Sequence, residues 1–330
     1  MTKIRKVLVT GGAGYIGSHA CKLLARAGYE PIVFDNLSTG WAEAVQFGPL
    51  VQGDLLDRDA VAAVFADTRP DAVMHFAALS DVGQSMRDPA LYWRNNVVGS
   101  MNLIDAAVEA GVQAFVFSST CATYGEQDGV TLDETCPQMP INAYGGSKRA
   151  VEDMLRDYGR ITGLRHVSFR YFNVAGADPD RQIGEFHRPE THLIPITLDV
   201  VRGRREHVTI YGDDYATPDG TCIRDYVHVL DLIEAHIRGL EYIADGGTES
   251  VFNLGTGHGF SVREVIDTVG KVTGDPVPAV TGDRRPGDCT RLVSGSHRAA
   301  ELLGWEPVHS TLEQMIADAW GWHQMPGYSR

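Results

Sequence analysis

A tyrosine and a lysine four residues apart are the clearest candidates for chemistry in this sequence. Tyr144 and Lys148 open a segment whose apolar residues Val151, Met154 and Leu155 recur at helical spacing. Residues at positions i and i+4 share one helix face, so both side chains can act on one ligand. A free phenol titrates at about pH 10, and a neighbouring ammonium group lowers that pKa. The pair predicts a general base, although the same spacing is also common on solvated helix faces.

A hydroxyl is expected beside this pair. The apolar run 114–118 predicts a strand, and Ser118-Ser119-Thr120 stands at its end. The Thr120 hydroxyl can hydrogen-bond the oxygen of a reacting ligand. The alternative is that Thr120 only caps a helix or a turn.

The first 35 residues predict a dinucleotide-binding unit. Residues 7–9 form a short apolar run, Gly11, Gly14 and Gly17 follow as G-x-x-G-x-x-G, and an amphipathic segment extends to residue 27. The glycines let the backbone approach a pyrophosphate, which then lies on the N–H groups at the start of the helix. Glycine triplets also occur in turns that bind no nucleotide, so the residues that follow decide between the two interpretations.

Two acids strengthen the nucleotide interpretation. Asp35 ends a second apolar run roughly twenty residues past the last glycine, where a carboxylate can bind ribose hydroxyls. An acid there disfavours a 2′-phosphate, so NAD is preferred to NADP. Asp54 closes the next run and is placed to meet the adenine. Beside a nicotinamide ring, a Tyr144 phenolate can remove a proton from a sugar hydroxyl while hydride leaves the same carbon.

The patterning of the first half predicts an α/β fold with a doubly wound parallel sheet of the Rossmann type. Strands are expected over residues 72–76 and 114–118, and helices over 60–65 and 91–110. Ligands bind such sheets at the carboxyl ends of the strands. The sequence becomes polar and rich in glycine and proline after Asn173. We therefore expect an NAD-binding domain over 1–173 and a smaller α/β substrate lobe over 174–330, with a helix near 229–242 packing back on the first domain.

Charged residues of the second lobe suggest a site for a diphosphate. Arg224 and Arg285 can clamp phosphate oxygens with their planar guanidinium groups. Asp288 can accept a hydrogen bond from a ribose, and Asn173 can hold a sugar or phosphate oxygen. For Arg284, pairing with a surface acid is the alternative.

Composition limits the possible partners and compartment. The chain has 330 residues and a formal net charge of −14, which argues against nucleic acid and anionic membranes as partners. The N-terminus shows no signal-peptide pattern. The five cysteines are scattered without a C-x-x-C pair, so we expect reduced thiols and a cytoplasmic protein. The histidines, His75, His192 and His228 among them, show no metal-ligand spacing, so no metal site is predicted.

Motifs along nearly the whole chain carry a resemblance to a known family. In chain order they are TGGAGYIGSH, FDNLS, GDLLD, HFAALSDVGQS, NNVVGS, FSSTCATYG, AYGGSK, RYFNVAGAD, GDDYATPDGTCIRDYVHV, NLGTG and RRPGD. The sequence resembles the extended short-chain dehydrogenase/reductase family, and within it the branch that epimerises UDP-sugars at C4. The resemblance implies interconversion of UDP-glucose and UDP-galactose through a 4-keto sugar, with NAD retained, Tyr144 as base and acid, and a homodimer.

The resemblance also implies roles for particular residues. Catalysis is assigned to Tyr144, Lys148 and Thr120. The positions that match cofactor contacts are Gly11, Gly14, Tyr15, Ile16, Gly17, Asp35, Asn36, Asp54, Leu55, Phe76, Ala77, Asn95, Lys148 and Tyr171. The positions that match contacts with the UDP-sugar are Thr120, Tyr144, Asn173, Leu193, Tyr211, Arg224, Arg285, Asp288 and Leu292. The modest bulk of Leu292 leaves N-acetylated UDP-sugars open as further substrates.

Three other functions are possible on the same fold. A nucleotide-sugar 4,6-dehydratase needs an Asp-Glu pair directly after the strand-end threonine, and a sugar-nucleotide decarboxylase needs a glutamate near Ala122. Here the two positions hold Cys121 and Ala122, which cannot move those protons. A non-catalytic NAD sensor on the same fold need not keep Tyr144, Lys148 and Thr120 together.

Overall fold

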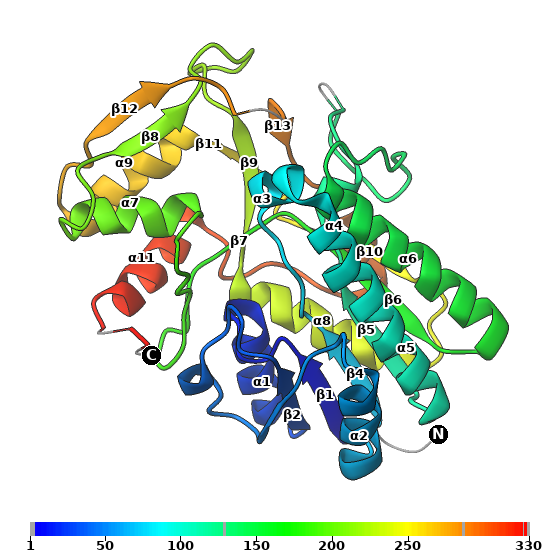
Figure 1. Cartoon of the computed structure of the whole chain (residues 1–330). Coiled ribbons are helices and arrows are strands. Elements are labelled where there is room, and N and C mark those ends of the chain that lie inside the picture. Colours follow the sequence, from blue (N-terminus) through cyan, green and yellow to red (C-terminus); the bar gives the residue numbers. More distant parts are fainter. Residues whose placement is uncertain (1–3, 128–129, 286–287, 326, 329–330) are drawn as a thin grey trace.

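The computed structural model describes residues 4–127, 130–285, 288–325 and 327–328, and a parallel sheet forms its centre (Figure 1). Within these residues the large sheet has seven strands in the order β10-β6-β5-β4-β1-β2-β3. This is a doubly wound order: β2 and β3 are added on one side of β1, and the later strands are added on its other side. The strands are β1 (Lys6–Thr10), β2 (Glu30–Asp35), β3 (Leu50–Gln52), β4 (Ala72–His75), β5 (Ala114–Ser118), β6 (His166–Tyr171) and β10 (Val251–Leu254). The predicted α/β class is confirmed.

Helices cover both faces of the large sheet. Side chains alternate along each strand, so Val7 and Val9 pack toward one layer of helices and Leu8 toward the other. The first layer contains α1 (Tyr15–Arg26) and α8 (Val229–Ala244). The second layer contains α2 (Arg58–Thr68), α5 (Gly99–Glu109) and α6 (Ala143–Thr162). Burial on both faces explains why the strands read as continuous apolar runs.

The segment expected as one helix over 91–110 is broken by a wider turn. It consists of α4 (Pro89–Tyr92), the π-helical η2 (Trp93–Val98) and α5. The Asn96 side chain accepts from Leu79 N at 2.9 Å, donates to Leu79 O at 3.0 Å and reaches the Ser147 hydroxyl at 3.1 Å. Such π-turns occur frequently at functional sites. A π-turn contains one residue more than an α-helical turn, and the spacing of apolar residues in the sequence does not reveal it.

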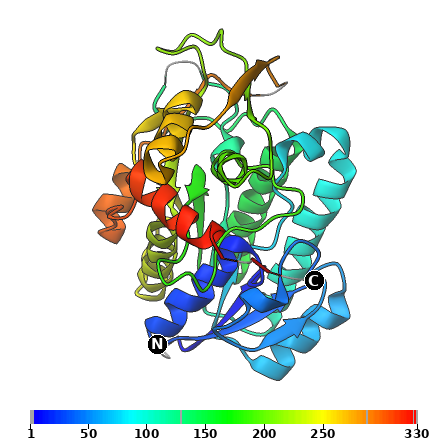
Figure 2. The ribbon, with the colours of Figure 1, turned by 90° about the vertical axis from the view of Figure 1, so that its left-hand side faces the viewer.

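A second lobe carries smaller sheets. Strand β9 pairs with β7, β11 and β13, and β8 pairs with β12. These strands are β7 (Asn173–Ala175), β8 (Val208–Tyr211), β9 (Ile223–His228), β11 (Gly259–Ser261), β12 (Ala279–Gly282) and β13 (Arg291–Leu292). Helices α7 (Leu193–Val201), α9 (Val262–Thr273) and α11 (Leu312–His323) share one apolar core. Both ribbon views place α9 and β2 at opposite ends of the molecule (Figures 1 and 2).

The large sheet draws on both halves of the chain. Helix α8 packs on it through Leu232 and Leu240, and β10 extends it by pairing with β6. Helix α10 (His297–Leu303) adds Ala299 and Leu303 to the same core. The large sheet therefore contains elements from both sides of residue 173. The domain boundary expected at that residue stays a prediction.

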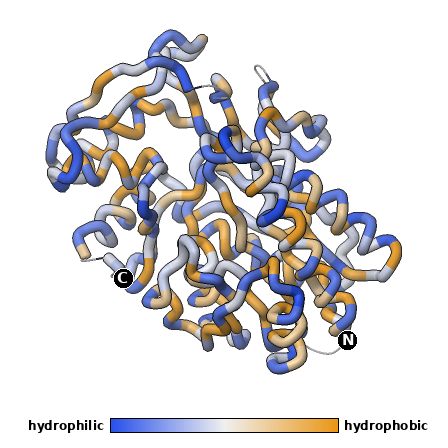
Figure 3. The backbone as a smooth tube through the Cα atoms, viewed as in Figure 1, coloured by the Kyte–Doolittle hydropathy of each residue, from blue (hydrophilic) through white to orange (hydrophobic). Residues whose placement is uncertain are grey.

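The remaining short elements are η1 (Ala42–Ala44), η3 (Cys121–Thr123) and α3 (Val82–Arg87). Hydropathy along the backbone matches the layers: apolar segments follow the strands, and hydrophilic segments gather at outer loops (Figure 3). Among the helices of the described residues, none combines the length and apolarity needed to cross a bilayer.

Candidate active site

One cavity of about 610 Å³ brings together the carboxyl ends of the large-sheet strands and the second lobe. Among the described residues, it is lined by every side chain predicted for the site except Lys148. Those lining residues are Gly11, Gly14, Tyr15, Ile16, Gly17, Asp35, Asn36, Asp54, Leu55, Phe76, Ala77, Asn95, Thr120, Tyr144, Tyr171, Asn173, Leu193, Tyr211, Arg224, Arg285, Asp288 and Leu292. Residues more than 270 positions apart therefore face the same space.

The glycine turn at one end of the cavity is packed too tightly for side chains. A Cβ on Gly17 would lie 2.1 Å from Gly11 O, and one on Gly11 would lie 2.6 Å from Ala77 N. Helix α1 begins at Tyr15, so the N–H groups of its first turn have no acceptors within the helix. The turn thus offers amide donors and close backbone approach, which fit a pyrophosphate.

Asp35 supports this turn as well as facing the cavity. Its Oδ2 accepts from Ala13 N at 3.0 Å, and its Oδ1 accepts from Leu37 N at 2.8 Å. Burial raises the pKa of Asp35, and these two hydrogen bonds act in the opposite direction. A carboxylate has further lone pairs, so it can also accept from ribose hydroxyls. Nearby, Asn36 donates to Asp54 Oδ2 at 3.0 Å. These residues fit the adenosine part of a dinucleotide.

We expect Gly17→Ala to abolish retention of the dinucleotide. The added methyl group would collide with the Gly11 carbonyl, so the turn would have to open. NAD released by denaturing the purified protein measures the effect. Gly295→Ala is the matched control, because the nearest atoms to its added Cβ lie at 3.5 Å. A Gly17→Ala protein that retains as much NAD as the control would contradict this role.

Tyr144 lies at the start of α6 and faces the cavity. Asn142 begins this helix, its Oδ1 accepting from Gly145 N at 2.8 Å. The Tyr144 side chain is buried. Burial, and to a smaller extent the neighbouring Tyr171, raises the pKa of its phenol above the usual range. The groups of the protein alone therefore do not produce the lowered pKa that positive charge was expected to give.

Thr120 begins a short helical turn at the cavity wall. Its Oγ1 accepts from Ala122 N at 3.2 Å and begins η3, while the residue also lines the cavity. A hydroxyl that accepts in this way still carries a proton to donate. Its hydrogen bond with Tyr144 lowers the pKa of that phenol, against the larger effect of burial.

Lys148 is buried one helical turn after Tyr144 on α6. Its Nζ donates to Ser118 O at 2.8 Å and sits 4.9 Å from the centre of the Phe117 ring. Burial lowers the pKa of Lys148 to about 7, although the carboxylate of Glu152 acts against this. The ammonium group is thus held at the carbonyl end of β5.

Charged groups of the second lobe also line the cavity. Arg224 lies 3.5 Å from Asp288 Oδ1, and Arg285 donates to Asp288 Oδ2 at 3.1 Å. The Arg285 guanidinium also lies 4.5 Å from the Tyr211 ring. Arg284 instead pairs with the exposed Asp214 at 2.6 Å, which is the surface alternative. Pro286 and Gly287 of the same motif lie outside the described residues.

Sequence reasoning missed several residues that line the cavity. The stretch 79–83 could have been found, because it follows the carboxyl end of β4. Cys222, Tyr226 and Cys289 carried no pattern of their own. Glu185, His187 and His192 also line the cavity, and the arrangement that they form with Glu190 depends on the fold of their loop.

Comparison with known proteins places the chain in a class. It belongs to the NAD dependent epimerase/dehydratase family, whose family model matches residues 7–255. The chain is 51% identical to the UDP-glucose 4-epimerase of Rhizobium meliloti (strain 1021) over 96% of both chains.

Solved structures give the same result. The UDP-glucose 4-epimerase from Brucella ovis in complex with NAD is 48% identical with a TM-score of 0.93, over 96% of this chain and 98% of that one. The UDP-glucose 4-epimerase from Bifidobacterium longum in complex with NAD+ and UDP is 36% identical with a TM-score of 0.92, over 97% of this chain and 98% of that one.

Proposed function

We propose that this chain interconverts UDP-glucose and UDP-galactose with NAD as a retained cofactor. The observation that carries the proposal is the single cavity shared by the glycine turn, by Tyr144 and Thr120, and by Arg224, Arg285 and Asp288. We assign the dinucleotide to the side formed by residues 1–173 and the UDP-sugar mainly to residues 174–330. The relatives named above are UDP-glucose 4-epimerases, two of them solved with NAD, and they support the reaction.

The residues suggest a sequence of proton movements at the sugar. When bound, NAD accepts the hydride of C4 and returns it. Tyr144 removes the proton of the C4 hydroxyl, and Thr120 hydrogen-bonds the same oxygen. Arg224 and Arg285 hold the diphosphate, so the 4-keto sugar can turn over while UDP stays in place. Tyr144 then returns the proton after the hydride has reached the opposite face of C4.

Lys148→Met should shift the pH dependence of turnover. Turnover rises with pH as the base loses its proton, and an ammonium group near the phenol lowers the pKa of that step. Removing the ammonium group should move the acid limb of the kcat profile to higher pH. The gap between variant and wild type should be widest below about pH 7, where Lys148 is charged. Superimposable profiles would argue against an electrostatic role.

A dehydratase or decarboxylase receives less support from the site. Either would need a proton-transfer group directly after Thr120. Burial raises the pKa of Cys121 to about 12, so this thiol stays protonated at neutral pH, and Ala122 has no proton to move. The reaction in which C4 is oxidised and then reduced requires neither residue.

The test is turnover of UDP-galactose by purified protein without added cofactor. The expected product is UDP-glucose, followed by NMR of the anomeric proton, with NAD recovered after denaturation. A 4-keto-6-deoxy product would favour the dehydratase. Retained NAD with no change in the sugar would favour the NAD sensor.

UDP-N-acetylgalactosamine is a second candidate substrate. Leu292 is half-buried on β13 and lines the cavity. We expect conversion of this sugar beside UDP-galactose, and we expect Leu292→Tyr to suppress it selectively by filling the space. Leu302→Tyr is the control, since Leu302 is 44% exposed on α10. A wild-type protein that converts only UDP-galactose would remove this candidate.

We also propose a cytoplasmic homodimer. Met86, Trp93, Val98 and Met101 are large apolar side chains that are at least 39% exposed along α3, η2 and α5. Helices α5 and α6 lie side by side on this outer flank (Figure 1), so a second copy can complete a four-helix arrangement. Light scattering tests the mass, and Val98→Glu should give monomers. The free thiols are typical of a reducing compartment.

A further inference from the structure

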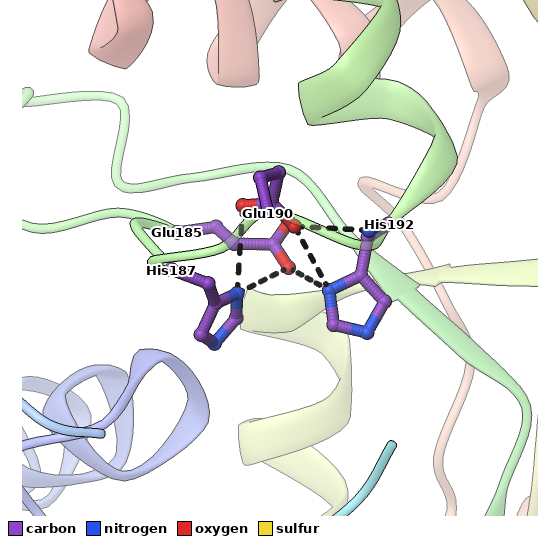
Figure 4. Close-up of side chains that lie close together, drawn as sticks. All are labelled: Glu185, His187, Glu190 and His192. Carbon is purple, nitrogen blue, oxygen red and sulfur yellow. Dashed lines mark hydrogen bonds and ion pairs between the residues drawn. The ribbon is translucent and has the colours of Figure 1, made fainter. Parts of the chain in front are cut away.

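Four side chains with metal-ligating atoms converge in the loop between β7 and α7. They are Glu185, His187, Glu190 and His192, and one ligand atom of each lies within 4.8 Å of all the others. The two imidazoles approach the two carboxylates from opposite sides, and each ring turns its Nδ1 inward (Figure 4). Within the described part of the chain, no other cluster of three or more histidine, cysteine or acidic side chains has its ligand atoms this close together.

Three of the four separations between imidazole nitrogens and carboxylate oxygens are close to the edge of a small coordination polyhedron, and the fourth is shorter. His187 Nδ1 lies 3.4 Å from Glu185 Oε1 and 3.5 Å from Glu190 Oε2. His192 Nδ1 lies 2.7 Å from Glu185 Oε1 and 3.4 Å from Glu190 Oε1. Ligands about 2.0 Å from a tetrahedral zinc ion are about 3.3 Å apart. A tetrahedral ion would require the contact between His192 Nδ1 and Glu185 Oε1 to lengthen from 2.7 Å.

One atom of the group is not satisfied by the protein. His187 Nδ1 is buried, and among the described residues it has no hydrogen-bond partner of normal geometry. It nevertheless faces two carboxylates at distances too long for strong hydrogen bonds. A buried nitrogen aimed at an anionic centre is an atom that a cation would satisfy.

The loop is held in place by contacts outside the group. Trp322 Nε1 donates to Glu185 O at 3.0 Å, and Trp41 Nε1 donates to Phe186 O at 2.8 Å. Glu190 Oε1 accepts from His192 N at 2.9 Å, which orients this carboxylate. The His192 side chain is 51% exposed, so an ion can enter from solvent. Affinity depends on such preorganisation and on an entry path.

We infer that Glu185, His187, Glu190 and His192 bind one divalent transition-metal ion of the zinc class. Two imidazoles and two carboxylates suit zinc, and two neutral rings with two carboxylates leave a charge of −2 for the ion to neutralise. Four protein ligands make a closed site, so the ion is structural. It ties down a loop of the cavity wall, which leads into Leu193 at the start of α7. The inference is independent of the proposed epimerase activity.

The alternative is a group of ion pairs without metal. In that case the carboxylates stabilise the charged rings: they raise the pKa of His187 to about 9 and hold the pKa of His192 well above its usual value. Protons and metal compete for the same nitrogens. Direct metal binding decides between the two arrangements.

The experiment uses the full chain without a histidine tag, freed of metal with a chelator and dialysed. Titration with Zn²⁺, followed by calorimetry and metal analysis after gel filtration, should give one ion per chain and a higher Tm. Titration with Co²⁺ should give the intense visible absorption of a tetrahedral site. His187→Gln should lose both signals. His258→Gln should keep them, because His258 is an exposed histidine outside the group.

Three outcomes would overturn the inference. They are no Zn²⁺ retained by the wild-type chain, a Co²⁺ spectrum of octahedral intensity, or equal binding by His187→Gln and wild type. The wild-type Co²⁺ spectrum decides the matter even if His187→Gln does not fold. Turnover of UDP-galactose, measured on the same metal-free sample, reports separately on the proposed function.

Discussion

Tyr144→Phe is expected to lower kcat by about 10²- to 10⁴-fold, the usual contribution of a positioned general base. The variant keeps the ring that packs edge-to-face against Tyr92, with ring centres 6.5 Å apart. Only the oxygen that would take and return the C4 proton is removed. The affinity for UDP should change little, because we assign the diphosphate to Arg224 and Arg285 and the substitution leaves both guanidinium groups in place. Steady-state turnover of UDP-galactose and calorimetric titration with UDP measure the two effects.

Tyr158→Phe is the matched control for this change. Tyr158 stands on the same helix, and its hydroxyl donates to Asp105. Its kcat should stay close to that of the wild type. Near-normal turnover in Tyr144→Phe would refute the assignment of the base. A parallel loss of UDP affinity would show that the ring oxygen supports the shape of the site.

Glu152→Gln is expected to cost about 3–5 kcal/mol of unfolding free energy, the usual effect of leaving one member of a buried ion pair without its partner. Glu152 and Arg170 are almost fully buried, with side chains 5% and 7% exposed. Arg170 donates to Glu152 Oε2 at 2.6 Å through Nη2 and to Oε1 at 3.0 Å through Nε. A glutamine keeps the shape and loses the charge, so the guanidinium remains buried and unpaired.

The same carboxylate links β5, β6 and α6 beneath the site. The Ser119 hydroxyl donates to it, and Gln138 Nε2 donates to Oε2 at 2.9 Å. Its charge also raises the pKa of Lys148 against the effect of burial. We therefore expect Glu152→Gln to lower turnover as well as stability, because Ser119 precedes Thr120 in the cavity wall.

Urea denaturation followed by circular dichroism measures the loss of stability. Asp153→Asn is the control: its neighbouring ion pairs with Arg149 and Arg156 are exposed, and such pairs contribute about 0–1 kcal/mol. The double change Glu152→Met with Arg170→Met should be less destabilising than Glu152→Gln, because it leaves no buried charge. If the single and control variants unfold at the same urea concentration, the pair does not stabilise the fold.

The nucleotide-binding unit could be read from the sequence because its parts are close along the chain. The run 7–9, the glycine turn and Asp35 all fall within the first 35 residues. The structure places β1, α1 and β2 there, with the acid at the end of β2. Apolar periodicity and the need for glycine in a close turn are properties of neighbouring residues, so they appear in the sequence directly.

The shared helix face of Tyr144 and Lys148 was predicted, but their separate surroundings were not. Tyr144 lines the cavity, while the Lys148 ammonium group is buried and donates to Ser118 O. The direction of the Tyr144 pKa also depends on burial among distant side chains. Both effects come from residues that only the packed helix and strands bring close.

Residues alone thus determined the type of fold, the nucleotide turn and the chemical groups available for catalysis. The tertiary structure decided that β10 and α8 complete the first sheet, that η2 widens into a π-turn, and that two histidines and two glutamates meet before α7. Local patterns reflect contacts between near neighbours along the chain. Contacts between distant segments depend on which packing buries the most apolar surface, and that balance is settled only when the whole core forms.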